Sequence, residues 1–377
     1  MGRLLAACLC TLFALWPVAG TAAGPRRVVI DQDGSGPGGS NMMSMLVLLQ
    51  SPEVEVLGIG IVTGNAWRDD EARHTLRLLE LIGRSDVPVA LGAVFPLVRT
   101  QQETELLVPV AGRVGWLGAW GGKPAAITQV PAGASVVPSP ARPLGPWETP
   151  PLAEGEPRTR PIAEDAAHFL IRQVRAHPHE VTVYAAGPLT DIALAIAIDP
   201  EFAGLAQGLV IMGGSLNPQT DDPEFASSPR HEFNFWFDPE AARITLRAHW
   251  PRIDVTTVDV SIKAMFTAEM LAAIARSKEP AAQYIARYSQ ERYYLWDELA
   301  ACAWLEPGII TRERRLYMDV DVSHGPAYGE TLTWSEELKP ALDLQLVHAQ
   351  LDVDLPRFVR QFVALMSAPT PRAAAVR

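Results

Sequence analysis

The chain has 377 residues and carries a formal net charge of −11 at pH 7. This acidity argues against nucleic acid and against an anionic membrane surface as partners. With 48% hydrophobic and 20% charged residues, the composition is typical of a globular protein, and the length allows one to three domains.

Residues 1–23 have the pattern of a secretory signal peptide. Arg3 supplies a positive charge, an apolar run extends from Leu4 to Val18, and the small residues at 19–23 offer a cleavage site. We therefore expect an exported protein, periplasmic or secreted, whose mature domain spans 24–377. The apolar run is short for a membrane span and no charged stop-transfer flank follows it, so no membrane attachment is expected after cleavage.

A glycine-rich stretch follows the first predicted strand, Val28–Ile30. Asp31 and Asp33 come directly after this strand, glycines then keep bulky side chains away, and Ser40 or Asn41 is expected to cap the next helix. Open α/β sheets bind ligands at the carboxyl ends of their strands, where this loop lies. Glycine-rich loops are usually surface turns, but two acids directly after a buried strand favour a binding site.

Strands and helices alternate along most of the chain. Apolar runs without alternation indicate strands covered on both faces, and a 3.6-residue period indicates amphipathic helices. Short links between them imply parallel strands with right-handed crossovers. The predicted fold is therefore α/β, a single domain with an open, mostly parallel central sheet flanked by helices. Further strands are predicted at 54–62, 87–91, 181–186, 209–212, 253–258, 316–322 and 342–345, and further helices at 69–83, 164–176, 191–198, 268–275, 281–295 and 355–366.

Residues 101–161 break this pattern and are predicted to form a long irregular insertion rich in proline and glycine. Trp116 and Trp120 argue that at least part of it packs against the domain. A lid over the site and a simple spacer are the two alternatives. Farther along the chain, Asp297 lies on an otherwise apolar face, where a charged carboxylate is costly unless it is paired or binds a metal.

Several motifs follow one another along the chain. They are Ser51-Pro-Glu-Val-Glu-Val-Leu-Gly-Ile59 followed by Thr63-Gly-Asn65, then Gly187-Pro-Leu-Thr-Asp-Ile-Ala-Leu-Ala195, Val210-Ile-Met-Gly-Gly214, Glu232-Phe-Asn234 and Asp238-Pro-Glu-Ala-Ala242. Together, in this order, they resemble the inosine–uridine-type nucleoside hydrolases. The resemblance runs from about Val28 to the end of the chain and leaves 101–161 largely outside it.

The resemblance implies an enzyme that uses water to cleave the N-glycosidic bond of ribonucleosides, giving free base and ribose, with calcium as cofactor. Breaking this bond builds positive charge on the ribose ring, which nearby carboxylates stabilise. Calcium prefers oxygen ligands and can hold both water and sugar hydroxyls, and a carboxylate beside it takes the proton of the water. The implied partner is a small-molecule nucleoside or related glycoside. Family members usually assemble as dimers or tetramers, so a homo-oligomer is expected.

The resemblance also implies roles for individual residues. Asp33 would be the general base and a metal ligand, and Asp31 would support it by orienting the loop. The expected metal ligands are Asp33, Asn41, the carbonyl of Ala186, and Asp297. The expected substrate-binding residues are Ser40, Asn65, Asn217, Glu232, Asn234, Trp296 and Asp297.

Three departures from the family pattern affect these roles. Ser40-Asn41 replaces a closing Asp-Asp pair, which removes negative charge on which calcium affinity depends, although Asn41 offers an amide oxygen. Trp296 stands where many members have a histidine before the aspartate; it cannot protonate a leaving group but could stack on a base. Asp191 takes the place of an asparagine in the Gly-Pro-Leu-Thr-Asn motif.

Two alternatives therefore stay open beside the nucleoside hydrolase. One is a hydrolase of another N- or O-glycoside, and the other is a non-catalytic ribose- or nucleoside-binding protein on the same fold. The retained acids favour an enzyme, whereas Ser40, Asn41 and Trp296 favour a binding protein. His231, next to Glu232, is a candidate acid for the leaving base, although a lone histidine is more often a packing residue.

Overall fold

The computed structural model describes residues 24–121 and 143–371. The predicted signal peptide at 1–23 lies outside the described residues. Among the described residues, no helix has the length and apolar character needed to cross a membrane.

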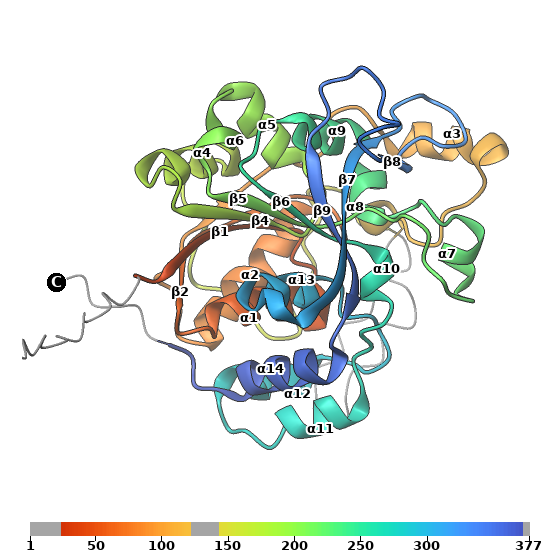
Figure 1. The fold of residues 1–377 in the computed structure, drawn as a ribbon. Coiled ribbons are helices and arrows are strands. Elements are labelled where there is room, and N and C mark those ends of the chain that lie inside the picture. The colour runs from red at the N-terminus through yellow and green to blue at the C-terminus, as the bar shows by residue number, and fades with distance from the viewer. Residues whose placement is uncertain (1–23, 122–142, 372–377) are drawn as a thin grey trace, which may run out of the picture.

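A mixed sheet forms the centre of the molecule (Figure 1). Its strands are β1 (Arg26–Gln32), β2 (Val54–Ile61), β3 (Val89–Leu91), β4 (Val181–Ala185), β5 (Gly208–Met212), β6 (Ile253–Thr256), β7 (Ile310–Val320), β8 (Thr331–Trp334) and β9 (Leu346–Val353). The order is β3-β2-β1-β4-β5-β6-β9-β7-β8, parallel from β3 to β9, with β7 antiparallel to both of its neighbours. The predicted open, mostly parallel sheet is confirmed.

Helices cover both faces of the sheet (Figure 1). One face carries α1 (Gly39–Leu49), α2 (Arg68–Leu81), α11 (Ala268–Ile274), α12 (Pro280–Tyr288), α13 (Trp296–Leu305) and α14 (Leu355–Ser367). The other carries α4 (Ala166–Ala176), α5 (Thr190–Ile198), α6 (Phe202–Leu205) and α9 (Pro239–Arg247). The connections carry further helices: α3 (Gln101–Ala111), α7 (Pro223–Ser227), α8 (Phe233–Phe237) and α10 (Val258–Ser261).

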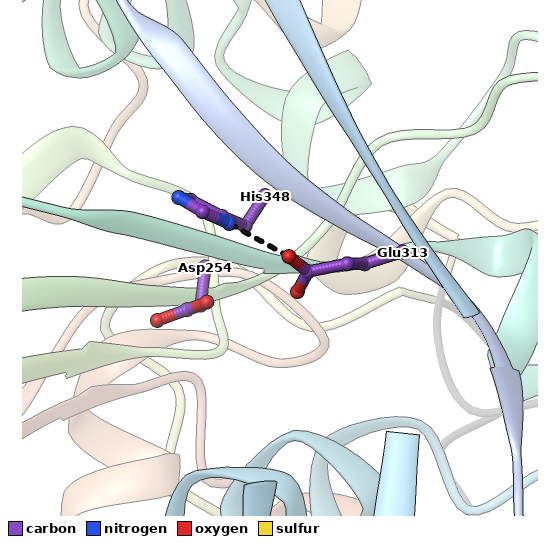
Figure 2. Close-up of side chains that lie close together, drawn as sticks. All are labelled: Asp254, Glu313 and His348. Atoms are coloured by element: carbon purple, nitrogen blue, oxygen red, sulfur yellow. Dashed lines mark hydrogen bonds and ion pairs between the residues drawn. The ribbon is translucent and has the colours of Figure 1, made fainter. Parts of the chain in front are cut away.

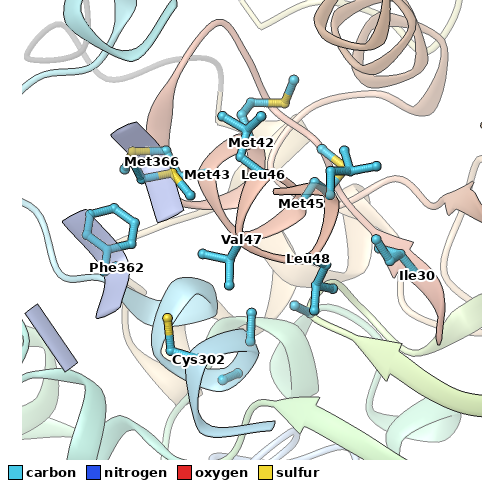
Figure 3. Close-up of a cluster of buried hydrophobic side chains, with 14 of the residues drawn as sticks. Ile30, Met42, Met43, Met45, Leu46, Val47, Leu48, Cys302, Phe362 and Met366 are labelled. Atoms are coloured by element: carbon cyan, nitrogen blue, oxygen red, sulfur yellow. The ribbon is translucent and has the colours of Figure 1, made fainter. Parts of the chain in front are cut away.

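Helix α1 lies at the centre of the larger core. Figure 3 shows Met43 and Val47 of α1 beside Cys302 of α13 and Phe362 of α14. Residues 41–49 are all buried, because this short helix is apolar around its whole circumference and is packed between the sheet and three other helices. The glycine-rich loop therefore leads into a rigid element.

The start of α1 differs from the sequence prediction. The helix begins at Gly39 with Gly38 as its N-cap, and neither Ser40 nor Asn41 caps it, because both side chains bond to acids elsewhere. Gly38 has φ 71°, which favours glycine, and a Cβ atom there would lie 2.6 Å from the carbonyl oxygen of Tyr288.

The predicted helix at 281–295 is divided in the structure. Helix α12 ends at Tyr288, and α13 begins at Trp296. The backbone between them bonds to another segment: Arg292 N donates to Phe266 O at 2.9 Å, and Leu295 N donates to Ala264 O at 2.7 Å. These bonds replace the bonds of a continuous helix.

Two further predictions are wrong at the level of secondary structure. Residues 101–111, predicted to be irregular, form helix α3, because the side chain of Thr100 accepts a bond from Glu103 N at 3.1 Å and caps it. Residues 342–345, predicted to be a strand, precede β9; Leu342 N instead donates to Pro340 O in a turn.

Candidate functional site

The site is built around Asp33, which directly follows β1 and is fully buried. Its Oδ2 atom accepts a hydrogen bond from the backbone nitrogen of Asn65 at 2.9 Å, and its Oδ1 atom accepts one from Asn41 Nδ2 at 2.7 Å. A Cβ atom on Gly64 would overlap the Asp33 carboxylate, so the loop after β2 must carry glycine there. The ends of two neighbouring parallel strands thus meet at one carboxylate.

Asp297 reaches the same point from the first turn of α13. Asn41 Nδ2 donates to Asp297 Oδ2 and to Gln32 Oε1, both at 3.2 Å, in addition to Asp33. Asp33 and Asp297 therefore point at a single atom, although they lie at opposite ends of the sequence. The structure brings together three of the predicted metal ligands.

Charge in this cluster is poorly compensated. Burial, and then the charge of Asp297, raise the pKa of Asp33 well above its ordinary value, although the Asn65 backbone nitrogen opposes the rise. Burial, and then the charge of Glu232, raise the pKa of Asp297 to about 8. Among the described residues, no lysine or arginine forms an ion pair with either acid. Two such carboxyls need a proton or a cation between them.

The donor set fits a divalent cation that prefers oxygen. Two carboxylates and the amide oxygen of Gln32 surround the Asn41 Nδ2 atom. The amide oxygen of Asn41, which was predicted to be a ligand, instead accepts a bond from Asn65. The predicted carbonyl ligand, Ala186, is at the same edge of the sheet: a Cβ atom on the next residue, Gly187, would lie 2.9 Å from the Asp33 nitrogen.

Gln32 is a site residue that the sequence reasoning missed. Its Oε1 atom accepts a bond from Asp33 N at 2.9 Å, and its Nε2 atom donates to Asp297 Oδ2 at 3.2 Å and to Ser44 Oγ at 3.0 Å. The alternation of side chains along a strand could have indicated this, because residue 32 faces the opposite side of β1 from residue 31.

Asp31 is correspondingly turned away from the Asp33 cluster and faces Asp191 of α5. Both carboxyls are buried, and burial followed by the charge of Asp191 raises the pKa of Asp31 well above its ordinary value. Burial raises the pKa of Asp191 to about 7, even though Ala93 N donates to it at 2.7 Å. Two buried carboxyls this close need a proton between them. Asp31 contacts the site through its backbone, because its carbonyl oxygen accepts a bond from Ala186 N at 3.1 Å.

Glu232 and Asn234 occupy the turn into α8. The Glu232 carboxylate caps this helix, accepting bonds from Asn234 N at 2.8 Å, Phe235 N at 3.0 Å and Gly214 N at 3.1 Å. Burial nevertheless raises its pKa to about 7. Its charge in turn raises the pKa of Asp33 and Asp297, which places Glu232 in the same electrostatic neighbourhood.

Asn65 links the cluster to the insertion. Its Nδ2 atom donates to Asn41 Oδ1 at 3.4 Å, and its Oδ1 atom accepts a bond from Trp116 Nε1 at 2.6 Å. Ala119 N also donates to Gly64 O at 2.9 Å. The described part of the insertion thus packs against the loop that carries Asn65.

The other predicted substrate-binding residues do not all lie at the Asp33 cluster. Ser40 Oγ donates to Glu298 Oε2 at 2.5 Å and accepts a bond from Asp297 N at 3.2 Å, so it supports Asp297. Trp296 packs against Phe225, with ring centroids 5.8 Å apart. Asn217 is exposed; its backbone nitrogen donates to Asp259 and its carbonyl oxygen accepts a bond from Gln219, and neither bond reaches the cluster.

Comparisons with known proteins identify the family. The model of the inosine-uridine preferring nucleoside hydrolases matches residues 28–360. The chain belongs to this family. A probable uridine nucleosidase 2 from Arabidopsis thaliana is 29% identical over 354 residues, covering 89% of this chain and 95% of that protein. The pyrimidine-specific ribonucleoside hydrolase RihA from Citrobacter koseri is 31% identical over 233 residues, covering 62% of this chain and 61% of that protein.

Solved nucleoside hydrolases share the fold. The plant nucleoside hydrolase PpNRh1 aligns with a TM-score of 0.70 at 24% identity, covering 92% of this chain and 100% of that chain. A purine-preferring ribonucleoside hydrolase from Gardnerella vaginalis aligns with a TM-score of 0.69 at 22% identity, covering 91% and 98%. The family resemblance, the fold class and the assignment as a hydrolase of an N-glycosidic bond are confirmed.

A second group of metal-binding side-chain types lies elsewhere in this nucleoside hydrolase. Figure 2 shows Asp254, Glu313 and His348 on β6, β7 and β9, with ligand atoms within 4.8 Å of one another. Asp254 is near the amino end of its strand, away from the carboxyl edge that carries Asp33. Arg252 forms two bonds of 2.7 Å to Asp254, and His348 bonds to Glu313 at 3.0 Å, so ion pairs already satisfy the group.

Proposed function

We propose that this nucleoside hydrolase cleaves the N-glycosidic bond of ribonucleosides, releasing free base and ribose. The observation that carries the proposal is the convergence of Asp33 and Asp297 on one position next to the loop of Asn65. Family membership supplies the reaction type, and this convergence supplies the residues. A protein that only binds ribose would have no need to bury acids with like charges so close together.

Asp33 is the proposed base. Water attacks the anomeric carbon as the bond to the base breaks, and Asp33 takes the proton of the water. Positive charge develops on the ribose ring in this step, and the negative charge of Asp297 and Glu232 stabilises it. Asn234 donates Nδ2 to Met212 O at 3.1 Å, which holds its amide in a fixed orientation for a ribose hydroxyl.

The proposed cofactor is a divalent cation, with calcium expected from the all-oxygen donor set. Asp33, Asp297, the side chain of Asn41 and the carbonyl of Ala186 would hold it. When bound, such an ion supplies positive charge that lowers the pKa of water and attracts sugar hydroxyls. This chain itself supplies the acids, keeps them buried and fixes their direction through Gln32 and Asn41.

Uridine is the substrate of choice for a first assay, because the relatives found by sequence include uridine nucleosidases and a pyrimidine-specific hydrolase. Purified protein is incubated with uridine, cytidine, inosine and adenosine, with calcium or with a chelator, and free base is measured by chromatography. We expect release of base that Asp33→Ala abolishes. The control is Asp221→Ala, because Asp221 is exposed in a loop before α7.

Two results would contradict the proposal. Nucleosides that raise the melting temperature without turnover would indicate a binding protein on this fold. Turnover of other glycosides, with none of ribonucleosides, would indicate a different hydrolase.

We also propose that the enzyme is exported and acts outside the cytoplasm, on the basis of the signal-peptide pattern at 1–23. Fractionation of the cells that express it, followed by amino-terminal sequencing, tests this. A mature chain that begins near residue 24 supports export. A chain that keeps Met1 and remains with cytoplasmic proteins would refute it.

A further inference from the structure

Among the described residues, the site has a proposed base for the water, but none of its tryptophan or histidine side chains is suited to protonate the departing nucleobase. Trp296 and Trp116 carry indole N–H groups, which form hydrogen bonds but do not release a proton near neutral pH. His231 is buried, and burial followed by the charge of Arg99 lowers its pKa to about 4. It is therefore neutral near pH 7. Poor leaving groups such as uracil need a proton as the bond breaks.

Helix α7 contacts two segments next to the site: the segment that leads into α13 and the insertion. Its residue Phe225 packs on Trp296, which directly precedes Asp297, and Tyr294 donates to Asp222 Oδ2 at 3.2 Å. These two contacts join one side of α7 to the segment that leads into α13. Figure 1 shows α7 and α8 at the same end of the sheet.

Glu224 joins the other side of α7 to the insertion. A Cβ atom on Gly115 would lie 3.1 Å from Glu224 Oε2, so this carboxyl is in contact with the backbone next to Trp116. Trp116 in turn donates to Asn65 and packs near Phe233, with ring centroids 6.3 Å apart. Helix α7 thus contacts both tryptophan segments: Phe225 packs on Trp296, and Glu224 lies against the backbone next to Trp116.

The surroundings of Glu224 disfavour its charged form, and its side chain still meets solvent. Its side chain is 31% exposed, and His231 Nε2 lies 3.8 Å from its Oε1 atom. Burial, and then the charge of Asp222, raise its pKa above the ordinary value. The charge of Glu224 also raises the pKa of Glu232, one of the acids proposed to stabilise the positive charge on the ribose ring. The titratable groups that face it are Asp222 on its own helix, His231 and Glu232 before α8, and Arg99 beyond His231.

We propose that Glu224 is the general acid that protonates the leaving base. The proposal rests on the proposed function and extends it. As the bond from the ribose carbon to the base nitrogen breaks, its electron pair passes to the base, and an oxygen or nitrogen of the base takes the Glu224 proton. The ribose carbon bonds to the water oxygen, and the proton of the water passes to Asp33. Solvent then returns a proton to Glu224 and accepts one from Asp33.

The test compares two substrates that differ in their need for an acid. Uridine requires protonation of its base, whereas 4-nitrophenyl β-D-ribofuranoside releases a stable phenolate. For Glu224→Gln we expect kcat on uridine to fall by about 100-fold, with kcat on the nitrophenyl riboside unchanged. In the unaltered protein, we expect the rate on uridine to decline at alkaline pH as Glu224 loses its proton, and we expect this decline to disappear in the variant. The control, Asp221→Asn, removes an exposed acid from the same loop and leaves both rates unchanged.

Activity on the nitrophenyl riboside also shows that the variant is folded. An equal loss on both substrates, no loss on either, or an unchanged alkaline limb would overturn the role of Glu224 while leaving the proposed function intact. If the unaltered protein turns over neither substrate, the proposed function fails, and the role of Glu224 fails with it.

Discussion

The side-chain nitrogen of Asn41 donates a hydrogen bond to the Asp33 carboxylate at 2.7 Å. The same nitrogen also donates to Asp297 at 3.2 Å, so the partial positive charge of one amide lies where two buried carboxylates converge. This amide charge is much weaker than that of a divalent ion, and it explains how the two acids are held together by the chain itself.

Replacing Asn41 by Asp is expected to strengthen calcium binding, because calcium affinity rises with the number of carboxylate ligands. Without a cation, the third acid adds repulsion to Asp33 and Asp297, and the variant should melt at a lower temperature than the unaltered protein. A calcium concentration of about 100 times the dissociation constant adds about 2.7 kcal/mol to the free energy of unfolding. Thermal denaturation in calcium and in chelator measures both effects. The control is Asn217→Asp, in an exposed position; equal calcium shifts in the two variants would contradict the prediction.

The Asp31–Asp191 pair predicts a pH-dependent stability. Burial raises the Asp191 pKa from 3.8 to about 7, so the folded protein keeps a proton that the unfolded chain releases. The free energy of unfolding therefore falls as pH rises from about 4 to about 7 and stays lower above that pH. Asp191→Asn replaces the shared proton by an amide donor to Asp31. We expect the variant to be more stable than the unaltered protein at pH 8, by about 1 kcal/mol or more.

Urea denaturation at pH 8 and pH 5 measures this difference, which should shrink at the lower pH. Asp221→Asn, at an exposed acid, serves as the control with no pH-dependent gain. A variant that is less stable than the unaltered protein at pH 8 would show that the pair is held by something other than a shared proton.

Trp116→Phe tests whether the insertion takes part in binding. The variant keeps an aromatic ring beside Phe233 but loses the 2.6 Å hydrogen bond that orients Asn65. One such bond contributes about 0.5–1.5 kcal/mol, so we expect KM for ribonucleosides to rise by up to about tenfold. Steady-state kinetics measure KM, with Trp147→Phe as the control because Trp147 is 65% exposed. An unchanged KM would mean that Trp116 serves only in packing.

Truncating a side chain in the core around α1 is expected to lower the stability of the protein strongly. Leu46 is fully buried in the cluster of Figure 3. Leu46→Ala removes apolar contacts and leaves a cavity, which should lower the free energy of unfolding by about 2–5 kcal/mol. Leu338→Ala, at a side chain that is 76% exposed, should change it little. Urea denaturation of both variants measures the difference, and similar losses in the two would contradict the assigned burial.

Local patterns in the sequence were sufficient to predict the order of most strands and helices. Apolar runs and turn residues depend on near neighbours, and the parallel sheet follows from their alternation. The same patterns placed Asp33 just past the first strand, where the structure has it. The motif order was specific enough to identify the nucleoside hydrolase family, which the match over 28–360 confirms.

Contacts between distant segments decided the rest. The packing of α5 turns Asp31 toward Asp191, and the bonds between 264–266 and 292–295 divide a predicted helix. Tertiary structure also assigned Asn41 to two acids instead of a helix cap, and brought Trp116 to Asn65. Side-chain hydrogen bonds depend on which groups meet after folding, and a local pattern carries no information about partners far along the chain.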